Sequence, residues 1–279
     1  MSGNELLRPR LIALDLDGTL IDESLTLRPR VVDAIERVRA LGITVTIVTG
    51  RMFTATRPFA KRLGIESPVA CYQGAAIFEA SNGRLVSETP VPHDVALEIY
   101  AFAKSHGLHV QFYAGDRFFV ESINRYSELY ARLAMTQPVV VASLPAAFEG
   151  RGSTKVNLVT EPERTPAIAA ELRSHLGDRA YVTRSNPEFI EMLHPAVNKG
   201  RAFVQVAELL NVPLEQTMAI GDSYNDVPLL GAAGFGIAMG SAPSELKDVA
   251  DAVVDGWKED GAAEALERYV IGVEVSGRS

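Results

Sequence analysis

The sequence predicts an α/β protein with a doubly wound, Rossmann-like parallel sheet and a second, α+β unit inserted into it. Strand-like apolar runs alternate with helical patterns up to residue 84 and again after residue 194, as in a parallel sheet with crossover helices. Between them, several strand-like segments accompany only two helical patterns. We therefore expect a discontinuous core domain of residues 1–84 and 194–279 and an α+β domain of residues 85–193.

The first half of the core begins with two strands that read as buried on both faces, Leu11–Leu14 and Ile43–Val48. Pro29 opens the helix between them, with apolar residues at helical spacing, and Gly42 ends it. A further helix at 53–63 leads to a third strand at 69–72.

The second half of the core repeats this alternation. A helix is predicted at 199–210 and a strand at 217–220, followed by further helices and strands at 227–232, 236–238, 246–250 and 252–254. In the insert, the predicted strands are 84–91, 110–113, 117–120, 155–159 and 179–183, and the predicted helices are 95–106 and 166–176.

The charge balance and composition restrict the partners. Lys and Arg number 27 against 35 Asp and Glu, and the net charge of −8 disfavours nucleic acid or an anionic membrane as a partner. No run approaches the roughly 18 apolar residues of a membrane span. Cys71 is the single cysteine, which excludes an internal disulfide. We expect a cytoplasmic protein; the sequence carries no signal for its oligomeric state.

Polar residues stand where three predicted core strands end, and ligands of open α/β sheets bind at that edge. Asp15 and Asp17 follow the first strand, Thr49 the second, and Asp222 the late one. Carboxylates crowded together repel one another unless a cation neutralises them, and a set of oxygen ligands suits Mg²⁺. Lys199 opens the preceding helix, so we expect it to reach the same edge as a positive charge for a phosphate.

Four segments in order resemble the motifs of the haloacid dehalogenase superfamily: Asp15-Leu16-Asp17-Gly18-Thr19-Leu20, Thr49-Gly50-Arg51, Asn198-Lys199-Gly200 and Gly221-Asp222-Ser223-Tyr224-Asn225-Asp226. Within it, the chain is similar to the Cof-type phosphatases, whose large cap lies between the second and third motifs. The insert at 85–193 falls in that interval. The chain departs from the family at Tyr72-Gln73-Gly74, where Asn-Gly is frequent.

The resemblance implies that Asp15 is a nucleophile forming an aspartyl-phosphate and that Asp17 protonates the leaving oxygen and then activates water. Because the acid role needs a proton near neutral pH, we expect burial or neighbouring carboxylates to raise the pKa of Asp17 above about 3.9. Mg²⁺ is expected on Asp15, the backbone carbonyl of Asp17 and Asp222. Ser223 and Asp226 are expected nearby. Asp226 is expected to support the metal ligands from behind or to stand at the start of a helix.

The transferring phosphoryl group is expected to meet the Leu16 and Gly50 amides, Thr49, Lys199 and Asn225. Arg51 is equally consistent with a surface residue, a partner of a motif carboxylate, or a substrate contact. In the cap, residues 184–188 are the candidates for facing the substrate.

The expected function is that of an Mg²⁺-dependent phosphatase of small phosphomonoesters, such as sugar phosphates. Two alternatives stay open: a phosphosugar mutase, which returns the phosphoryl group to its substrate, and a non-catalytic protein that binds a phosphorylated metabolite. Release of free phosphate distinguishes them.

Overall fold

The computed structural model describes residues 7–22 and 24–272. The ends of the expected core, residues 1–6 and 273–279, lie outside this range. The chain forms two compact units, of which the first comprises Met1–Thr49, Arg57–Val86 and Asn198–Ser279, and the second Gly50–Thr56 and Ser87–Val197.

The first unit contains a five-stranded parallel sheet in the order β14-β13-β12-β1-β2. Its strands are β1 (Leu11–Leu14), β2 (Thr44–Ile47), β12 (Thr217–Gly221), β13 (Phe235–Ala238) and β14 (Ala252–Val253). Leu11 of β1 pairs with Thr217 on one side and Thr44 on the other. The chain winds outward from β1 in both directions, so the strand order reverses there, and the predicted fold class is confirmed.

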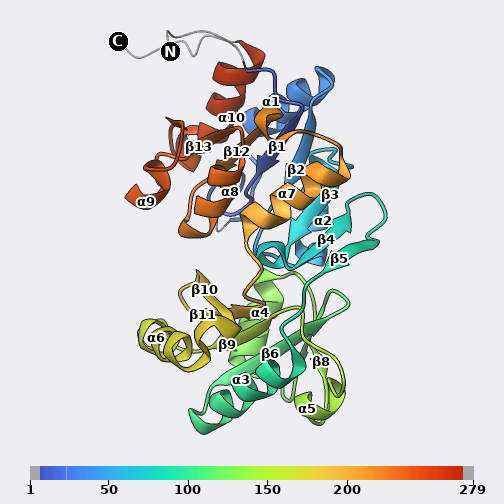
Figure 1. Cartoon of the computed structure of the whole chain (residues 1–279), viewed down its shortest axis with the longest axis vertical. Helices are drawn as coiled ribbons and strands as arrows, with labels where there is room; N and C mark the ends of the chain where they lie inside the picture. Colours follow the sequence, from blue (N-terminus) through green and yellow to red (C-terminus); the bar gives the residue numbers. More distant parts are fainter. Residues whose placement is uncertain (1–6, 23, 273–279) are drawn as a thin grey trace. The chain divides into compact units, whose positions relative to one another are not determined.

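Helices cover both faces of this sheet, and β1 is completely buried. The helices of the first unit, with α2 shared by both units, are α1 (Pro29–Ala40), α2 (Phe53–Arg62), α7 (Lys199–Leu209), α8 (Val227–Ala232), α9 (Ser244–Lys247) and α10 (Gly261–Leu266). α7 and α8 contact each other (Figure 1), and Phe203 and Leu229 pack with Leu11 in one apolar cluster. α1 contacts β2 and α10. The predicted helix at 246–250 is wrong in position, because α9 begins directly after Pro243, whose ring fixes the entry.

A smaller sheet in the order β3-β4-β5 follows β2 along the chain. It contains β3 (Pro68–Cys71), β4 (Ala76–Glu79) and β5 (Leu85–Glu88). β4 was not predicted, although it pairs antiparallel with β3 after the four-residue connection 72–75. The predicted strand at 84–91 is shorter and joins this sheet, because β4 offers it an edge.

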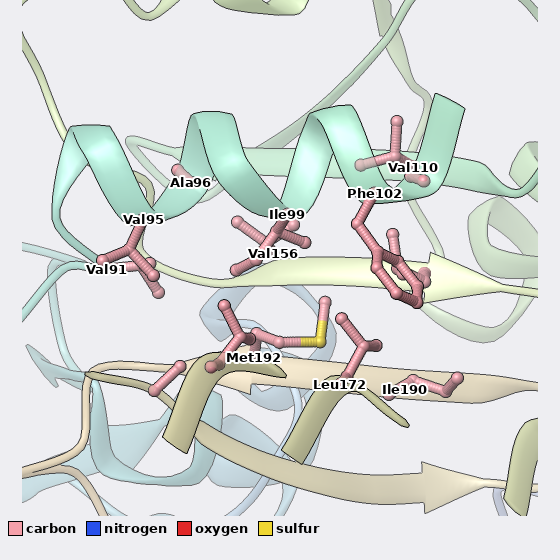
Figure 2. Packing of buried hydrophobic residues seen from close by; sticks show 14 of the residues in the cluster. Val91, Val95, Ala96, Ile99, Phe102, Val110, Val156, Leu172, Ile190 and Met192 are labelled. Atoms are coloured by element: carbon pink, nitrogen blue, oxygen red, sulfur yellow. The ribbon is translucent and has the colours of Figure 1, made fainter. Parts of the chain in front are cut away.

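The second unit is built on a six-stranded sheet in the order β10-β11-β9-β6-β7-β8. Its elements are α3 (His93–Ser105), β6 (His109–Ala114), β7 (Arg117–Val120), α4 (Arg125–Leu133), β8 (Val139–Val140), α5 (Leu144–Ala147), β9 (Val156–Val159), α6 (Thr165–Leu176), β10 (Tyr181–Asn186) and β11 (Phe189–Leu193). Figure 2 shows Val95, Ile99 and Phe102 of α3 beside the strands that carry Val156 and Met192. The α+β character of the insert is therefore confirmed.

The segment Gly50–Thr56 packs within the second unit for an identifiable reason. The Asp116 carboxylate accepts hydrogen bonds from the backbone amides of Phe53, at 2.8 Å, and Thr54, at 2.7 Å. These amides lie in the first turn of α2, where the helix itself offers no carbonyl acceptor, and a carboxylate stabilises such a helix end. No helix in the described part of the chain has the length and apolar character needed to cross a membrane.

Candidate active site

Three carboxylates and one ammonium group meet at the carboxyl ends of β1 and β12. Asp15, Asp222 and Asp226 each place one oxygen within 4.8 Å of the others. Lys199 Nζ donates to Asp15 Oδ1 at 2.6 Å and to Asp226 Oδ1 at 2.7 Å. The backbone amide of Asp15 donates to Ile220 O at 3.0 Å, which fixes the end of β1 beside β12. The predicted edge therefore does gather charged side chains.

The start of α7 places Lys199 in this cluster. The Asn198 side chain accepts a hydrogen bond from the Arg201 amide at 2.8 Å and caps the helix, which begins at Lys199. Gly200 allows α7 to lie against α8, since a Cβ there would be 2.1 Å from Pro228 O. The Asn-Lys-Gly sequence thus supplies a cap, a buried charge and a close helix contact.

Asp226 organises the loop that follows β12. Its Oδ2 accepts hydrogen bonds from the amides of Asp222, at 3.1 Å, and Ser223, at 3.0 Å, while its Oδ1 accepts from Lys199. Both oxygens are therefore engaged within the protein. This geometry suits a carboxylate that holds the loop and the lysine more than one that coordinates a cation directly.

Within this cluster, Asp222 is a carboxylate that contacts the turn after β1. Its Oδ1 accepts a hydrogen bond from Thr19 Oγ1 at 3.1 Å. A Cβ at Gly18, whose φ is +82°, would be 2.1 Å from Asp222 Oδ2, so the backbone of this turn reaches the carboxylate as only glycine permits. The glycine of the Asp-x-Asp-Gly-Thr sequence thus gives the turn its close approach to Asp222.

The cluster holds more negative charge than its lysine compensates. Burial, and then the charge of Asp226, raise the pKa of Asp15 well above its ordinary value, although Lys199 lowers it. Burial and Asp226 likewise raise the pKa of Asp222 to about 6. Burial alone would lower the pKa of Lys199, but Asp15 and Asp226 raise it, so the lysine stays charged. The ionised forms of these carboxylates are disfavoured in the cluster as it stands. A hard divalent cation, which prefers oxygen ligands, would stabilise the ionised forms, so the cluster fits such a cation.

The other predicted residues that follow β1 and β2 differ in their burial. Asp17 is exposed in the turn after β1, because the chain has already left the sheet there. Of the two environments that we expected for it, burial or neighbouring carboxylates, burial is therefore absent. The carbonyl of buried Leu16 accepts from the amides of Leu20 and Ile21, both at 2.9 Å. Thr49 is fully buried, and its amide donates to Ala70 O at 2.9 Å.

The remaining members of the predicted set divide between the two units. Gly50 and Arg51 belong to the second unit, where Arg51 Nη1 donates to Leu133 O at 3.3 Å. Asn225, half-buried in the first unit, donates to Gln73 Oε1 at 2.9 Å. We did not predict a role for Gln73 or Thr19. The departure from Asn-Gly at residues 73–74 is the signal that pointed to Gln73.

Comparisons with known proteins agree with this geometry. The sequence profile of haloacid dehalogenase-like hydrolases matches residues 12–266. The pyridoxal phosphate phosphatase YbhA of Escherichia coli is 28% identical, over 94% of this chain and 99% of its own length. The 5-amino-6-(5-phospho-D-ribitylamino)uracil phosphatase YitU of Bacillus subtilis is 28% identical, over 94% of this chain and 98% of its own.

A solved structure gives the same result. The crystal structure of a haloacid dehalogenase-like hydrolase from Bacteroides thetaiotaomicron superposes with a TM-score of 0.83 at 28% identity, covering 93% of this chain and 99% of that one. The similarity therefore spans both units of the chain.

Proposed function

Because the chain belongs to the haloacid dehalogenase-like hydrolase family and is therefore an enzyme, we propose that it is an Mg²⁺-dependent phosphatase of small phosphomonoesters that acts through an aspartyl-phosphate. One observation carries the proposal: buried Asp15 directly follows β1, accepts a hydrogen bond from Lys199 and is clustered with Asp222. A carboxylate held in this way can act as a nucleophile toward a phosphoryl group.

Two displacements complete the proposed reaction. An Asp15 carboxylate oxygen attacks phosphorus, the bond from phosphorus to the ester oxygen breaks, and Asp17 protonates that leaving oxygen. Water then attacks the phosphorus of the aspartyl-phosphate and gives a proton to Asp17. The bond from phosphorus to the Asp15 oxygen breaks, inorganic phosphate is released and the Asp15 carboxylate is restored. The exposed position of Asp17 leaves its side chain accessible to a leaving group and to water.

The cation is assigned to Asp15, the backbone carbonyl of Asp17 and Asp222, with Ser223 and Asp226 behind them. When bound, Mg²⁺ would neutralise the charge that otherwise keeps an anionic nucleophile from an anionic phosphate. Asp226 supports this arrangement by holding the amide of Asp222 at 3.1 Å.

The phosphoryl oxygens are assigned to the Leu16 and Gly50 amides, the Thr49 hydroxyl, Lys199 and Asn225. Arg51 is left out of this set, since its guanidinium donates to Leu133 O.

Small phosphorylated metabolites are the proposed substrate class. The relatives named above act on pyridoxal phosphate and on a phosphoribitylamino-uracil, two molecules that share a phosphomonoester and differ in the rest. Selection among such substrates is assigned to the insert, acting as a cap, with residues 184–188 as candidates. These residues lie on the hairpin of β10 and β11. The cytoplasmic location and the exclusion of nucleic acid and membrane partners stay predictions.

The decisive experiment is a panel of phosphomonoesters assayed for free phosphate with Mg²⁺ and with EDTA. We expect phosphate release that needs the metal and disappears in Asp15→Asn. An isomerised phosphosugar without phosphate release would establish a mutase, and binding without any turnover would establish a sensor protein. Either result would overturn the proposal.

A further inference from the structure

The turn Tyr72–Gly74 between β3 and β4 has an unusual backbone. Tyr72 and Gln73 have φ values of 54° and 59°, and both are buried with 1% exposure. Residues with a Cβ rarely adopt this left-handed conformation, and two in succession persist only where the surroundings require it. The turn is thus fixed by its contacts rather than by its local preference.

Its contacts reach two of the loops that carry candidate site residues. The Gln73 amide donates to Thr49 O at 3.0 Å. A Cβ at Gly74 would be 2.8 Å from Asn198 O and 2.6 Å from Ala202 Cβ, so this glycine lets the turn lie directly on the start of α7. The turn therefore supports both Thr49 and the helix end that carries Lys199.

The Gln73 side chain reaches a third loop. Its Oε1 accepts a hydrogen bond from Asn225 Nδ2 at 2.9 Å. The Asn225 Oδ1 atom is buried and has no hydrogen-bond partner among the described residues. An amide has two N–H donors and one carbonyl acceptor, which point in opposite directions. Because Oε1 is an acceptor, it selects the orientation in which Asn225 turns its nitrogen toward Gln73.

That orientation matters for an anionic ligand. One N–H of Asn225 is used by Gln73 and the second remains available to a phosphoryl oxygen, which accepts hydrogen bonds only. If the amide were rotated by half a turn, its carbonyl oxygen would replace this donor and repel the anion. Gln73 can therefore decide whether Asn225 attracts or repels a phosphate.

We propose that Gln73 is a positioning residue of the phosphoryl site, whose side chain orients the Asn225 amide and whose backbone supports Thr49. This inference rests on the proposed function, because it takes Asn225 as a phosphate contact. Gln73 itself is not assigned a contact with the substrate.

The test measures binding of inorganic phosphate by calorimetry in the presence of Mg²⁺, so that it does not depend on turnover. Gln73→Met keeps the length of the side chain and removes the acceptor; we expect phosphate binding to weaken about tenfold. KM for a phosphomonoester should rise more than kcat falls, because a binding contact shared by substrate and transition state is lost. Gln205→Met, an equivalent change on the exposed side of α7, serves as the matched control.

A double-mutant cycle separates positioning from a general structural role. If Gln73 acts through Asn225, then Gln73→Met combined with Asn225→Ala should bind phosphate within about twofold of Asn225→Ala alone. Effects that multiply would overturn the proposal, as would phosphate binding by Gln73→Met within twofold of wild type.

Gln73→Gly provides a second variant in case the first does not fold, since glycine adopts the left-handed conformation readily. We expect its melting temperature to be unchanged or higher while phosphate binding weakens; parallel loss or retention of both would contradict positioning. If the wild-type protein hydrolyses phosphomonoesters and these variants bind phosphate normally, the role of Gln73 is refuted and the proposed function is not. A wild-type protein that neither hydrolyses esters nor binds phosphate refutes the proposed function together with it.

Discussion

Asp222 offers a test of the proposed metal site that is independent of catalysis. Burial and the neighbouring Asp226 raise its pKa in the folded protein from an ordinary value of 3.8 to about 6. Between these two pH values the folded state binds more protons than the unfolded state, so the stability of the metal-free protein falls as the pH rises. Asp222→Asn mimics the protonated side chain and should remove this part of the pH dependence.

The size of the effect follows from the pKa of Asp222, raised from 3.8 to about 6. A shift of roughly two units corresponds to about 3 kcal/mol between the two limiting pH values, of which about 2 kcal/mol falls between pH 4.5 and 7.5. The free energy of unfolding of Asp222→Asn minus that of wild type should therefore be about 2 kcal/mol larger at pH 7.5 than at pH 4.5, so the variant is relatively more stable at the higher pH.

Urea unfolding of the metal-free protein at the two pH values measures this difference. Asp33→Asn is the matched control, because the Asp33 side chain is 65% exposed on α1. Saturating Mg²⁺ should stabilise wild type at pH 7.5, by about 2.7 kcal/mol at a hundred times Kd, and much less at pH 4.5. A relative stability of Asp222→Asn that stays constant within about 0.5 kcal/mol, or an equal effect of Mg²⁺ at both pH values, would refute this reasoning.

Three further predictions concern single side chains. Asp15→Asn should reduce turnover at least a thousandfold, because an amide does not form the acyl phosphate; phosphate release near the wild-type rate would exclude the covalent route. Asp17→Asn should slow both chemical steps, by about a hundredfold or more, as judged by pre-steady-state phosphate release, and unchanged rates would remove its acid and base role. In the second unit, Glu191→Gln should lower the free energy of unfolding by about 3 kcal/mol, since it leaves Lys155, 1% exposed, without its charged partner. Urea unfolding checks this, with the exposed Glu171→Gln as control, and a loss below about 1 kcal/mol would contradict it.

The core could be predicted from the sequence because its elements carry strong local signals. Pro29 starts α1 where expected, and the apolar run Leu11–Leu14 matches β1. A strand buried on both faces leaves its first polar residue at the edge of the sheet, which is why Asp15 could be placed there. The meeting of Asp15, Lys199 and Asp222 then follows from parallel pairing of β1 and β12.

The insert was less predictable because tertiary contacts decide its elements. β11, over Phe189–Leu193, is entirely buried and pairs with β9 and β10, yet its sequence contains Glu191, which breaks the apolar pattern. The ion pair with Lys155 makes that glutamate acceptable in the interior. α4 did carry a local signal, since Asn124 and Ser127, three residues apart, form a capping box at its start.

Asp17 and Gln73 show a different limit, in which neighbours remote in sequence set the environment. The expectation of burial or neighbouring carboxylates around Asp17 came from its role, whereas the path of the turn after β1 determines its exposure. Gln73 lies 152 residues from Asn225, and their hydrogen bond depends on a left-handed turn that no local sequence pattern predicts. Such positions are found by tracing hydrogen-bond partners outward from the motif residues.

The charge of the cluster explains how an acidic protein can bind an anion. Three carboxylates, on Asp15, Asp222 and Asp226, face one ammonium group on Lys199. When all are ionised, the uncompensated negative charge is equal in magnitude and opposite in sign to the charge of a single divalent cation such as Mg²⁺. Without the cation the raised pKa values of Asp15 and Asp222 show that the ionised carboxylates are disfavoured. The proposed site therefore becomes able to receive a phosphate only when the cation is present, which makes the metal a condition of substrate binding as well as of chemistry.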